Sequence, residues 1–195
     1  MAKADPAAQK KERQKAARWV VSIFLVTIFI SGAISLLSDL LMENSSMAVA
    51  FLILLLIILV GIIFDIIGMA VASADEKPFH AMAARKVPGA REAISLLRNA
   101  ERVSSICNDV VGDICGVVSG SASATIAVQI LSNFDFTWPQ VVSLLMSALA
   151  AGLTVGGKAI GKSFAVNSST KIVHIVGKVV HALHPAPVSP KKKKK

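Results

Sequence analysis

The chain has 195 residues, a mass of 20.5 kDa, 54% hydrophobic residues and only 17% charged residues. An average soluble domain carries about 25% charged residues, so the composition excludes an ordinary soluble globular protein, and its hydrophobicity excludes a mainly disordered chain. The lack of tyrosine and the 5% aromatic content argue against an outer-membrane barrel, which carries aromatic girdles. The predicted fold class is therefore all-α, a polytopic helical membrane protein.

The net charge of +9 at pH 7 is unevenly distributed along the chain. Residues 1–18 carry +4 and residues 158–195 carry +9, whereas residues 19–157 carry −4. Strongly basic proteins often bind nucleic acid, but here the positive charge flanks apolar segments, where it reports membrane orientation. We therefore expect membrane lipids as partners and no nucleic acid.

Four segments are long and apolar enough to cross a bilayer core of about 30 Å, which takes about 20 helical residues. They are residues 19–41, 47–72, 103–131 and 137–160. The first segment has a basic start and also admits a cleaved signal peptide. Its apolar stretch is longer than the usual 7–15 or so residues, and Asp39 and Glu43 follow without a clear cleavage site. An additional first membrane helix is the favoured interpretation.

The basic residues outside the spans fix the expected topology. They lie in residues 1–18, in residues 77–102 and after residue 158, whereas the loops 42–46 and 132–137 contain no Lys or Arg. Lys and Arg accumulate on the cytoplasmic side of membranes. We expect a multi-pass protein of the plasma membrane with both ends in the cytoplasm.

Two polar segments outside the spans have helical periodicity. Residues 90–98 place apolar side chains three and four residues apart, which predicts a short helix on the cytoplasmic face. Residues 168–183 predict an amphipathic helix in the membrane interface, with His174 and His181 on its basic face. A metal site at these histidines is the less favoured alternative. Residues 185–195, rich in Pro and Lys, are predicted to form a disordered tail attracted to anionic lipid.

Ionisable residues inside the spans are the main functional candidates, because a charge in the bilayer is costly unless it faces protein or water. Oxygen ligands from carboxylates, amides and hydroxyls suit hard cations such as Mg²⁺. The predicted metal ligands are Asp65, Ser105, Asn108, Asp109 and Asp113. The ammonium group of Lys158 in the last span would modulate their charge, and its alternative role is a structural ion pair with Asp109 or Asp113.

Glycines recur in the last two spans at spacings that allow close helix packing. The predicted packing positions are Gly112, Gly116, Gly120, Gly156 and Gly157. Such packing would occur within the bundle or between two copies of the chain, and we expect a homodimer.

Three stretches resemble the transmembrane domain of the CNNM/CorC family of magnesium transporters. The first is Phe64–Ala90, which ends in Val-Pro-Gly-Ala, and the second is Gly89–Arg102, similar to the family's helix before its second span. The third is Gly157–Ala165, similar to the family's Gly-Glu-x-x-Pro-Lys-Ser/Thr-Leu-Ala motif. The resemblance covers residues 47–184, so residues 19–41 would be an additional first span. It implies Mg²⁺ movement by a dimer, often coupled to Na⁺, here without the family's CBS pair.

Several motif residues of the family are replaced in this chain. Asp65 stands in place of a serine, Gly68 in place of a glutamate, and Lys158 in place of the glutamate in the last motif. The family's Gly-Asn-x-x-x-Asn falls on Val110, Val111 and Cys115. The resemblance thus implies the fold more directly than the activity.

These observations lead to two functional expectations. The first is a divalent-cation transporter, or a transporter-like protein, with Mg²⁺ or a similar ion as its cargo. The second is a non-transporting scaffold or partner subunit whose vestigial ion site is occupied by Lys158. An enzyme is not expected, because no catalytic Ser/His or His/Glu arrangement lies within a span.

Overall fold

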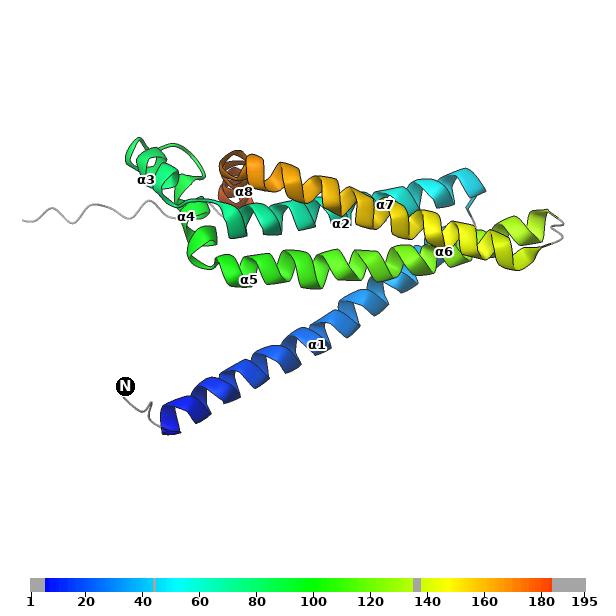
Figure 1. The fold of residues 1–195 in the computed structure, drawn as a ribbon, viewed down its shortest axis with the longest axis horizontal. Coiled ribbons are helices and arrows are strands. Elements are labelled where there is room, and N and C mark those ends of the chain that lie inside the picture. The colour runs from blue at the N-terminus through cyan, green and yellow to red at the C-terminus, as the bar shows by residue number, and fades with distance from the viewer. Residues whose placement is uncertain (1–5, 44, 135–137, 184–195) are drawn as a thin grey trace, which may run out of the picture. The chain divides into compact units, whose positions relative to one another are not determined.

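The structure is a computed structural model that describes residues 6–43, 45–134 and 138–183, and every element in these residues is helical (Figure 1). The long helices are α1 (Pro6–Glu43), α2 (Met47–Ser73), α6 (Asp113–Asn133) and α7 (Pro139–Asn167). The short ones are α3 (Lys77–Ala84), α4 (Ala90–Arg98), α5 (Ala100–Ser105), the π-helix η1 (Ile106–Gly112) and α8 (Ser169–Leu183). The predicted all-α class is confirmed.

Four helical segments are long and apolar enough to cross a membrane: Ala17–Met42, Met47–Ser73, Ala100–Asn133 and Pro139–Asn167. Each overlaps a predicted span. The helix of the first span starts earlier than predicted, at Pro6, because residues 6–18 are rich in Ala, Gln, Lys, Arg and Glu, which are strong helix formers. The helix of the fourth span extends past its predicted end at residue 160 to Asn167, because no proline interrupts residues 161–167. These four apolar helices are compatible with a multi-pass membrane protein.

The chain forms two compact units, and both use α2 and α7. The first contains residues 1–61 and 110–154, and the second contains residues 62–109 and 155–195. The tail predicted at residues 185–195 lies outside the described residues.

In the first unit, α1 packs along α6 through a small number of apolar side chains. Ile23 and Ile34 of α1 contact the cluster formed by Val110, Ile114 and Val118. Near the end of α1, the Nε2 of Gln129 donates a hydrogen bond of 2.9 Å to the carbonyl of Met42. Most of the large apolar side chains between residues 19 and 41 of α1 are exposed, as expected for a helix that faces lipid.

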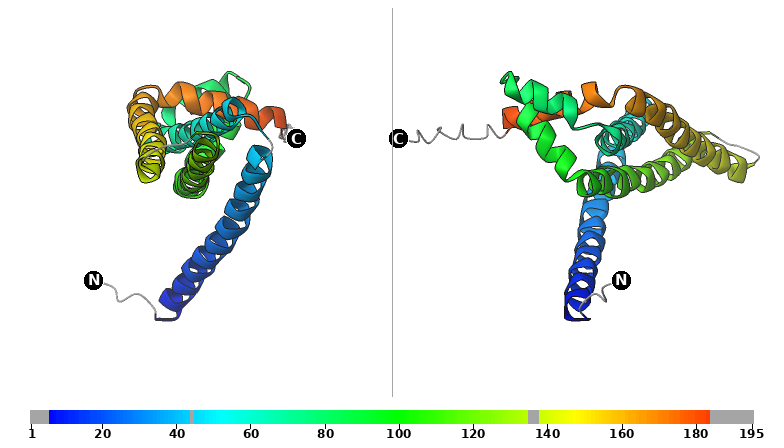
Figure 2. Two further views of the ribbon diagram at one scale, coloured as in Figure 1. Left: turned by 90° about the vertical axis from the view of Figure 1, so that its right-hand side faces the viewer. Right: turned by 60° about the vertical axis from the view of Figure 1, so that its left-hand side comes forward.

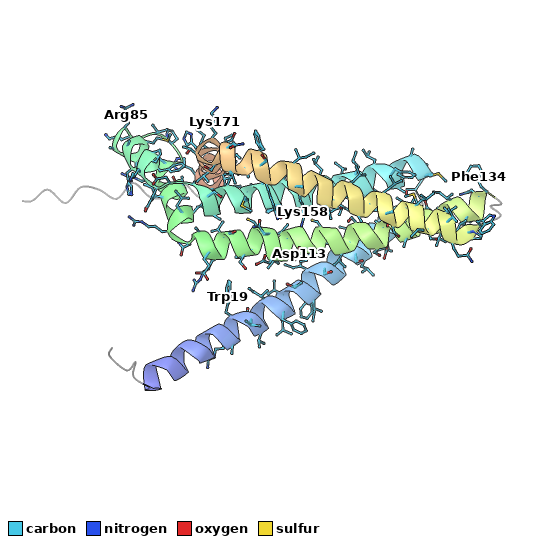
Figure 3. The ribbon with its side chains drawn as sticks, in the orientation of Figure 1. Trp19, Arg85, Asp113, Phe134, Lys158 and Lys171 are labelled. Carbon is cyan, nitrogen blue, oxygen red and sulfur yellow. The ribbon has the colours of Figure 1, made fainter. Side chains whose placement is uncertain are left out.

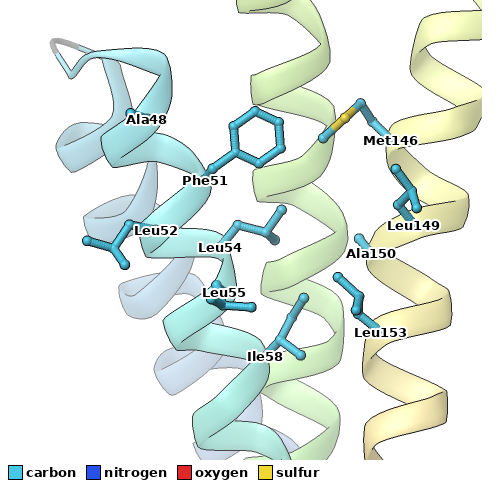
Figure 4. A pocket seen from close by; sticks show the side chains of 10 residues that line it. All are labelled: Ala48, Phe51, Leu52, Leu54, Leu55, Ile58, Met146, Leu149, Ala150 and Leu153. Carbon is cyan, nitrogen blue, oxygen red and sulfur yellow. The ribbon is translucent and has the colours of Figure 1, made fainter.

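The α2 and α7 helices of the first unit enclose an entirely apolar groove of about 400 Å³ (Figure 4). Its walls are aliphatic and aromatic side chains with one methionine: Ala48, Phe51, Leu52, Leu54, Leu55, Ile58, Met146, Leu149, Ala150 and Leu153. No charged side chain lines it.

In the second unit, α3, α4 and α8 pack against the ends of α2 and α7. Their shared core is formed by Ala70, Val71, Phe79, Ala93, Ala165 and Val173, each at most 1% exposed. Figure 2 shows α8 turning away from the line of α7 to lie beside α4. The helices predicted at 90–98 and 168–183 are confirmed as α4 and α8, whereas the membrane-interface position of α8 stays a prediction.

The α4–α8 crossing depends on two glycines. Gly89, which precedes α4, has a φ of 81°, and a Cβ there would lie 2.5 Å from the backbone nitrogen of Lys178. A Cβ at Gly177 would overlap the carbonyl oxygen of Gly89 and lie 3.1 Å from the Cβ of Ala93. The two backbones therefore touch, and only glycine fits at either position.

Candidate functional site

A buried carboxylate of α2 and a partly buried ammonium group of α7 face each other in the second unit. Asp65 follows the apolar run of α2 and is 4% exposed. Lys158 lies on α7 (Figure 3), and its Nζ is 3.7 Å from the Oδ1 of Asp65. The side chain of Lys158 is 19% exposed and that of Asp65 is 6% exposed. At this separation and burial, each charge lowers the cost of placing the other in the span.

The approach of α7 to α2 around this pair is set by glycines on either side of Lys158. A Cβ at Gly157 would overlap the Cδ1 of Ile62, and a Cβ at Gly161 would lie 2.7 Å from the Cγ1 of Ile66. Because glycine lacks this atom, the helices pack closely here. Gly157, which was predicted as a packing position, and Gly161 therefore both lie where α7 contacts α2.

Asn108 brings a third polar side chain to the same face of α2. Its Nδ2 donates a hydrogen bond of 3.3 Å to the hydroxyl of Ser104, and its Oδ1 fits against Gly68, where a Cβ would overlap it. Gly68 is three residues after Asp65, so both lie on one side of α2. Asp65, Asn108 and Lys158 are called the polar centre below.

Two oxygen atoms of the polar centre have no hydrogen-bond partner although they are buried. These are the Oδ2 of Asp65 and the Oδ1 of Asn108. Buried acceptors without partners are rare in native proteins and costly in free energy. Both atoms are good ligands for a hard cation, so the chemistry of the polar centre fits a positively charged ligand.

The π-helix η1 carries Asn108 at the third of its seven residues. Short π-helical segments inside long helices are rare and occur often at functional sites. The wider turn changes which side chains face a neighbouring helix. The sequence analysis did not detect this segment, because its residues read as an uninterrupted α-helical span.

Asp109 and Ser105 lie on another side of this segment. The hydroxyl of Ser105 donates a hydrogen bond of 2.7 Å to the Oδ2 of Asp109, and Asp109 is exposed. Both side chains line an open cavity of about 520 Å³, to which Glu101, Ser104 and Ala72 also contribute. The sequence analysis missed Glu101 because this residue lies before the predicted start of the span. Ser104 links the cavity to the polar centre, since it lines the cavity and accepts the hydrogen bond of Asn108.

The remaining predicted positions have varied surroundings. Asp113 is the first residue of α6, belongs to the first unit and is exposed. A Cβ at Gly61 would lie only 2.8 Å from the Cβ of Cys115 on α6, so α2 and α6 approach closely there. A Cβ at Gly116, Gly120 or Gly156 would meet nothing within 4 Å, so these three positions are not packed within the bundle. Their role in a dimer stays a prediction.

The two histidines of α8 bind α4 and its preceding loop. His181 Nδ1 is 2.7 Å from Glu92 Oε1, and His174 Nε2 is 3.3 Å from the carbonyl oxygen of Pro88. Burial opposes the ionisation of Glu92, but the hydrogen bonds from His181 and from its own backbone N–H outweigh this, helped by the charges of His181 and Arg91. The pKa of Glu92 consequently lies below its usual value. The histidines thus hold the α4–α8 crossing together.

Among the described residues, no group of three or more His, Cys, Asp or Glu side chains is arranged to hold a metal ion. The predicted pocket of three converging carboxylates is therefore not present in this part of the chain. One reason is that Asp65 is buried against α7 whereas Asp109 is exposed. The polar centre instead combines one carboxylate, one amide and one ammonium group.

Comparison of the chain with protein-family models, with curated proteins and with solved structures found no match. Its function is therefore argued from the polar centre itself.

Proposed function

We propose that this protein binds a cation in its polar centre and moves it through the membrane, with Mg²⁺ or another divalent cation as its cargo. The observation that carries the proposal is the pair of buried oxygens without partners, Asp65 Oδ2 and Asn108 Oδ1, on one side of α2. An ion bound by both would satisfy two acceptors that otherwise cost free energy. The CNNM/CorC resemblance of residues 47–184 points to the same class of cargo.

The open cavity beside Asp109 supports a route to this site. It is lined by the carboxylates of Glu101 and Asp109 and by the hydroxyl of Ser104, which is hydrogen-bonded to Asn108. Clusters of carboxylates raise the local concentration of cations. A cation attracted to the cavity would be one hydrogen-bonded side chain away from Asn108.

The orientation and assembly are part of the proposal. The excess of Lys and Arg in residues 1–18, 77–102 and 158–195 favours a plasma-membrane protein with both ends in the cytoplasm. The cavity would then open near the cytoplasmic end of its span. Gly116 and Gly120 on α6 leave room for a second helix, which favours a homodimer packed through small residues.

The test is ion flux into liposomes that contain the purified full chain and a Mg²⁺-sensitive dye. We expect uptake above that of empty liposomes, at least a tenfold loss in Asp65→Asn, and a partial loss in Asn108→Ala. Asp75→Asn is the matched control, because Asp75 is an exposed acid outside the spans. Equal uptake by wild type and Asp65→Asn would contradict the assignment of Asp65.

A second candidate function is supported by the Asp65–Lys158 pair. An ammonium group 3.7 Å from the only carboxylate of the polar centre is the arrangement expected of a non-transporting scaffold or partner subunit with an occupied, vestigial ion site. This alternative predicts no flux for any cation. It also predicts that Asp65→Asn lowers the melting temperature without changing any response to Mg²⁺.

A further inference from the structure

We propose that Lys158 is a tethered cation that competes with the free ion for Asp65 and thereby sets the affinity of the polar centre. This inference rests on the proposed function, because it concerns the regulation of the same site. It differs from a purely structural ion pair in one respect. A structural pair only stabilises the fold, whereas a competitor lowers the affinity of the site for every cation that needs the Asp65 carboxylate.

The first argument is the position of the ammonium group. Lys158 Nζ lies 3.7 Å from Asp65 Oδ1, while Asp65 Oδ2 stays without a partner. One oxygen of the carboxylate therefore faces a positive charge and the other is left for a ligand. An incoming ion at Oδ2 would lie close to the ammonium group, and like charges at such distances repel strongly in a medium of low dielectric constant.

The second argument is charge balance. Asp65 and Lys158 together carry no net charge, and Asn108 adds none. A divalent ion bound beside both would give the polar centre a net charge of +2, and a net charge of +1 would remain even if the ammonium group moved away. Uncompensated charge in this environment is costly, so tight binding of a divalent ion requires that Lys158 be absent or withdrawn.

The third argument is the freedom of the lysine to withdraw. The side chain of Lys158 is 19% exposed, three times the 6% of Asp65, so it has an open side while the carboxylate does not. Lysine side chains in spans commonly extend their ammonium group toward water. The backbone around Lys158, in contrast, is fixed in position, because Gly157 and Gly161 of α7 pack closely against Ile62 and Ile66 of α2.

The experiment is calorimetric titration of Mg²⁺ into the detergent-purified full chain, in wild type and in four variants of α7. Lys158→Gln removes the competing charge, Lys158→Arg keeps it, and Lys158→Glu replaces it by a second carboxylate. Lys162→Gln is the matched control, because it removes one positive charge from an exposed position one turn later. The melting temperature of each variant shows that it is folded.

We expect Lys158→Gln to bind at least tenfold more tightly than wild type, which corresponds to about 1.4 kcal/mol. Lys158→Glu should bind more tightly still, while Lys158→Arg and Lys162→Gln should remain near the wild-type affinity. Equal affinity in wild type, Lys158→Gln and Lys158→Glu would overturn the competition but leave the cation site in place. A lack of binding in all of them, with intact folding, would overturn the cation site itself and the competition with it.

Discussion

The two compact units use the same two helices, α2 and α7, in opposite ways. In the first unit these helices face each other across an entirely apolar groove, lined by residues such as Leu54 and Leu149. In the second unit they present Asp65 and Lys158 to each other. The same two helices thus carry an apolar groove in the first unit and an ion pair in the second.

This difference shows how the chain accommodates charged groups within the spans, where an isolated charge is costly in free energy. Within the spans, Asp65 is buried with its Oδ1 3.7 Å from the Nζ of Lys158, so that its charge is partly compensated. The compensation is incomplete, because two oxygens have no partner. Buried acceptors without partners are rare in native proteins, and polar side chains within spans often mark functional sites.

The largest expected effect comes from breaking the ion pair on one side only. Asp65→Leu leaves the Lys158 ammonium group without this carboxylate, and the loss of one partner of a buried pair costs about 3–5 kcal/mol. The double variant Asp65→Leu/Lys158→Leu makes the α2–α7 contact of the second unit apolar, like the α2–α7 groove of the first unit. It should recover most of the lost stability. Thermal unfolding in detergent measures the stability lost in Asp65→Leu and the stability recovered in the double variant.

A double variant as unstable as Asp65→Leu would contradict this expectation. In that case, the polar character of the second unit would be required for folding rather than for an ion. Retained stability with lost flux would sharpen the comparison, because it would separate packing from function.

A smaller effect is expected at the α4–α8 crossing, which the first unit lacks. Gly177→Ala introduces a Cβ that overlaps the carbonyl oxygen of Gly89, and such overpacking costs about 1–3 kcal/mol. Gly120→Ala is the control, because a Cβ there meets nothing within 4 Å and alanine favours a helix over glycine by about 0.5–1 kcal/mol. Hydrogen exchange of the α8 amides should rise in the first variant only, and equal exchange in both would show that the close approach is unimportant.

The smallest effect concerns the Glu92–His181 contact. The pKa of Glu92 is lowered in the folded protein, so its contribution to stability is present above its unfolded value of 4.5 and is lost as the pH falls through the folded value. Glu92→Gln should therefore destabilise α8 docking at pH 7 by less than about 1 kcal/mol, since His181 is 42% exposed. The difference from wild type should shrink as the pH falls below 4.5, and a difference that grew on acidification would have the wrong sign.

Much of the fold could be predicted because the signals are local. Apolar runs set the four spans, and the 3.6-residue periodicity set α4 and α8. The ends of the helices were less predictable. The start of α1 at Pro6, for instance, depends on the helix propensity of a charged segment that carries no hydrophobic pattern.

The candidate site was only partly predictable. Asp65, Asn108 and Lys158 were identified because polar residues in spans are unusual, but their partners depend on helix rotation, which a single sequence does not encode. Gly68 was noted only as a lost glutamate, whereas its role is to leave room for the Oδ1 of Asn108. The π-helix that presents Asn108 has no composition of its own and was therefore not predicted.

A combined variant tests whether the free ion and Lys158 compete for the same carboxylate. Mg²⁺ affinity should be measured by calorimetry for Lys158→Gln and for Lys158→Gln/Asp65→Asn. If they compete, the affinity gained by the first substitution should be lost when the second is added, because the Asp65 carboxylate beside Lys158 would be the ligand of the ion. If the double variant kept the gain, Lys158 would act on cations only through its general charge, and Asp65 would not be their ligand.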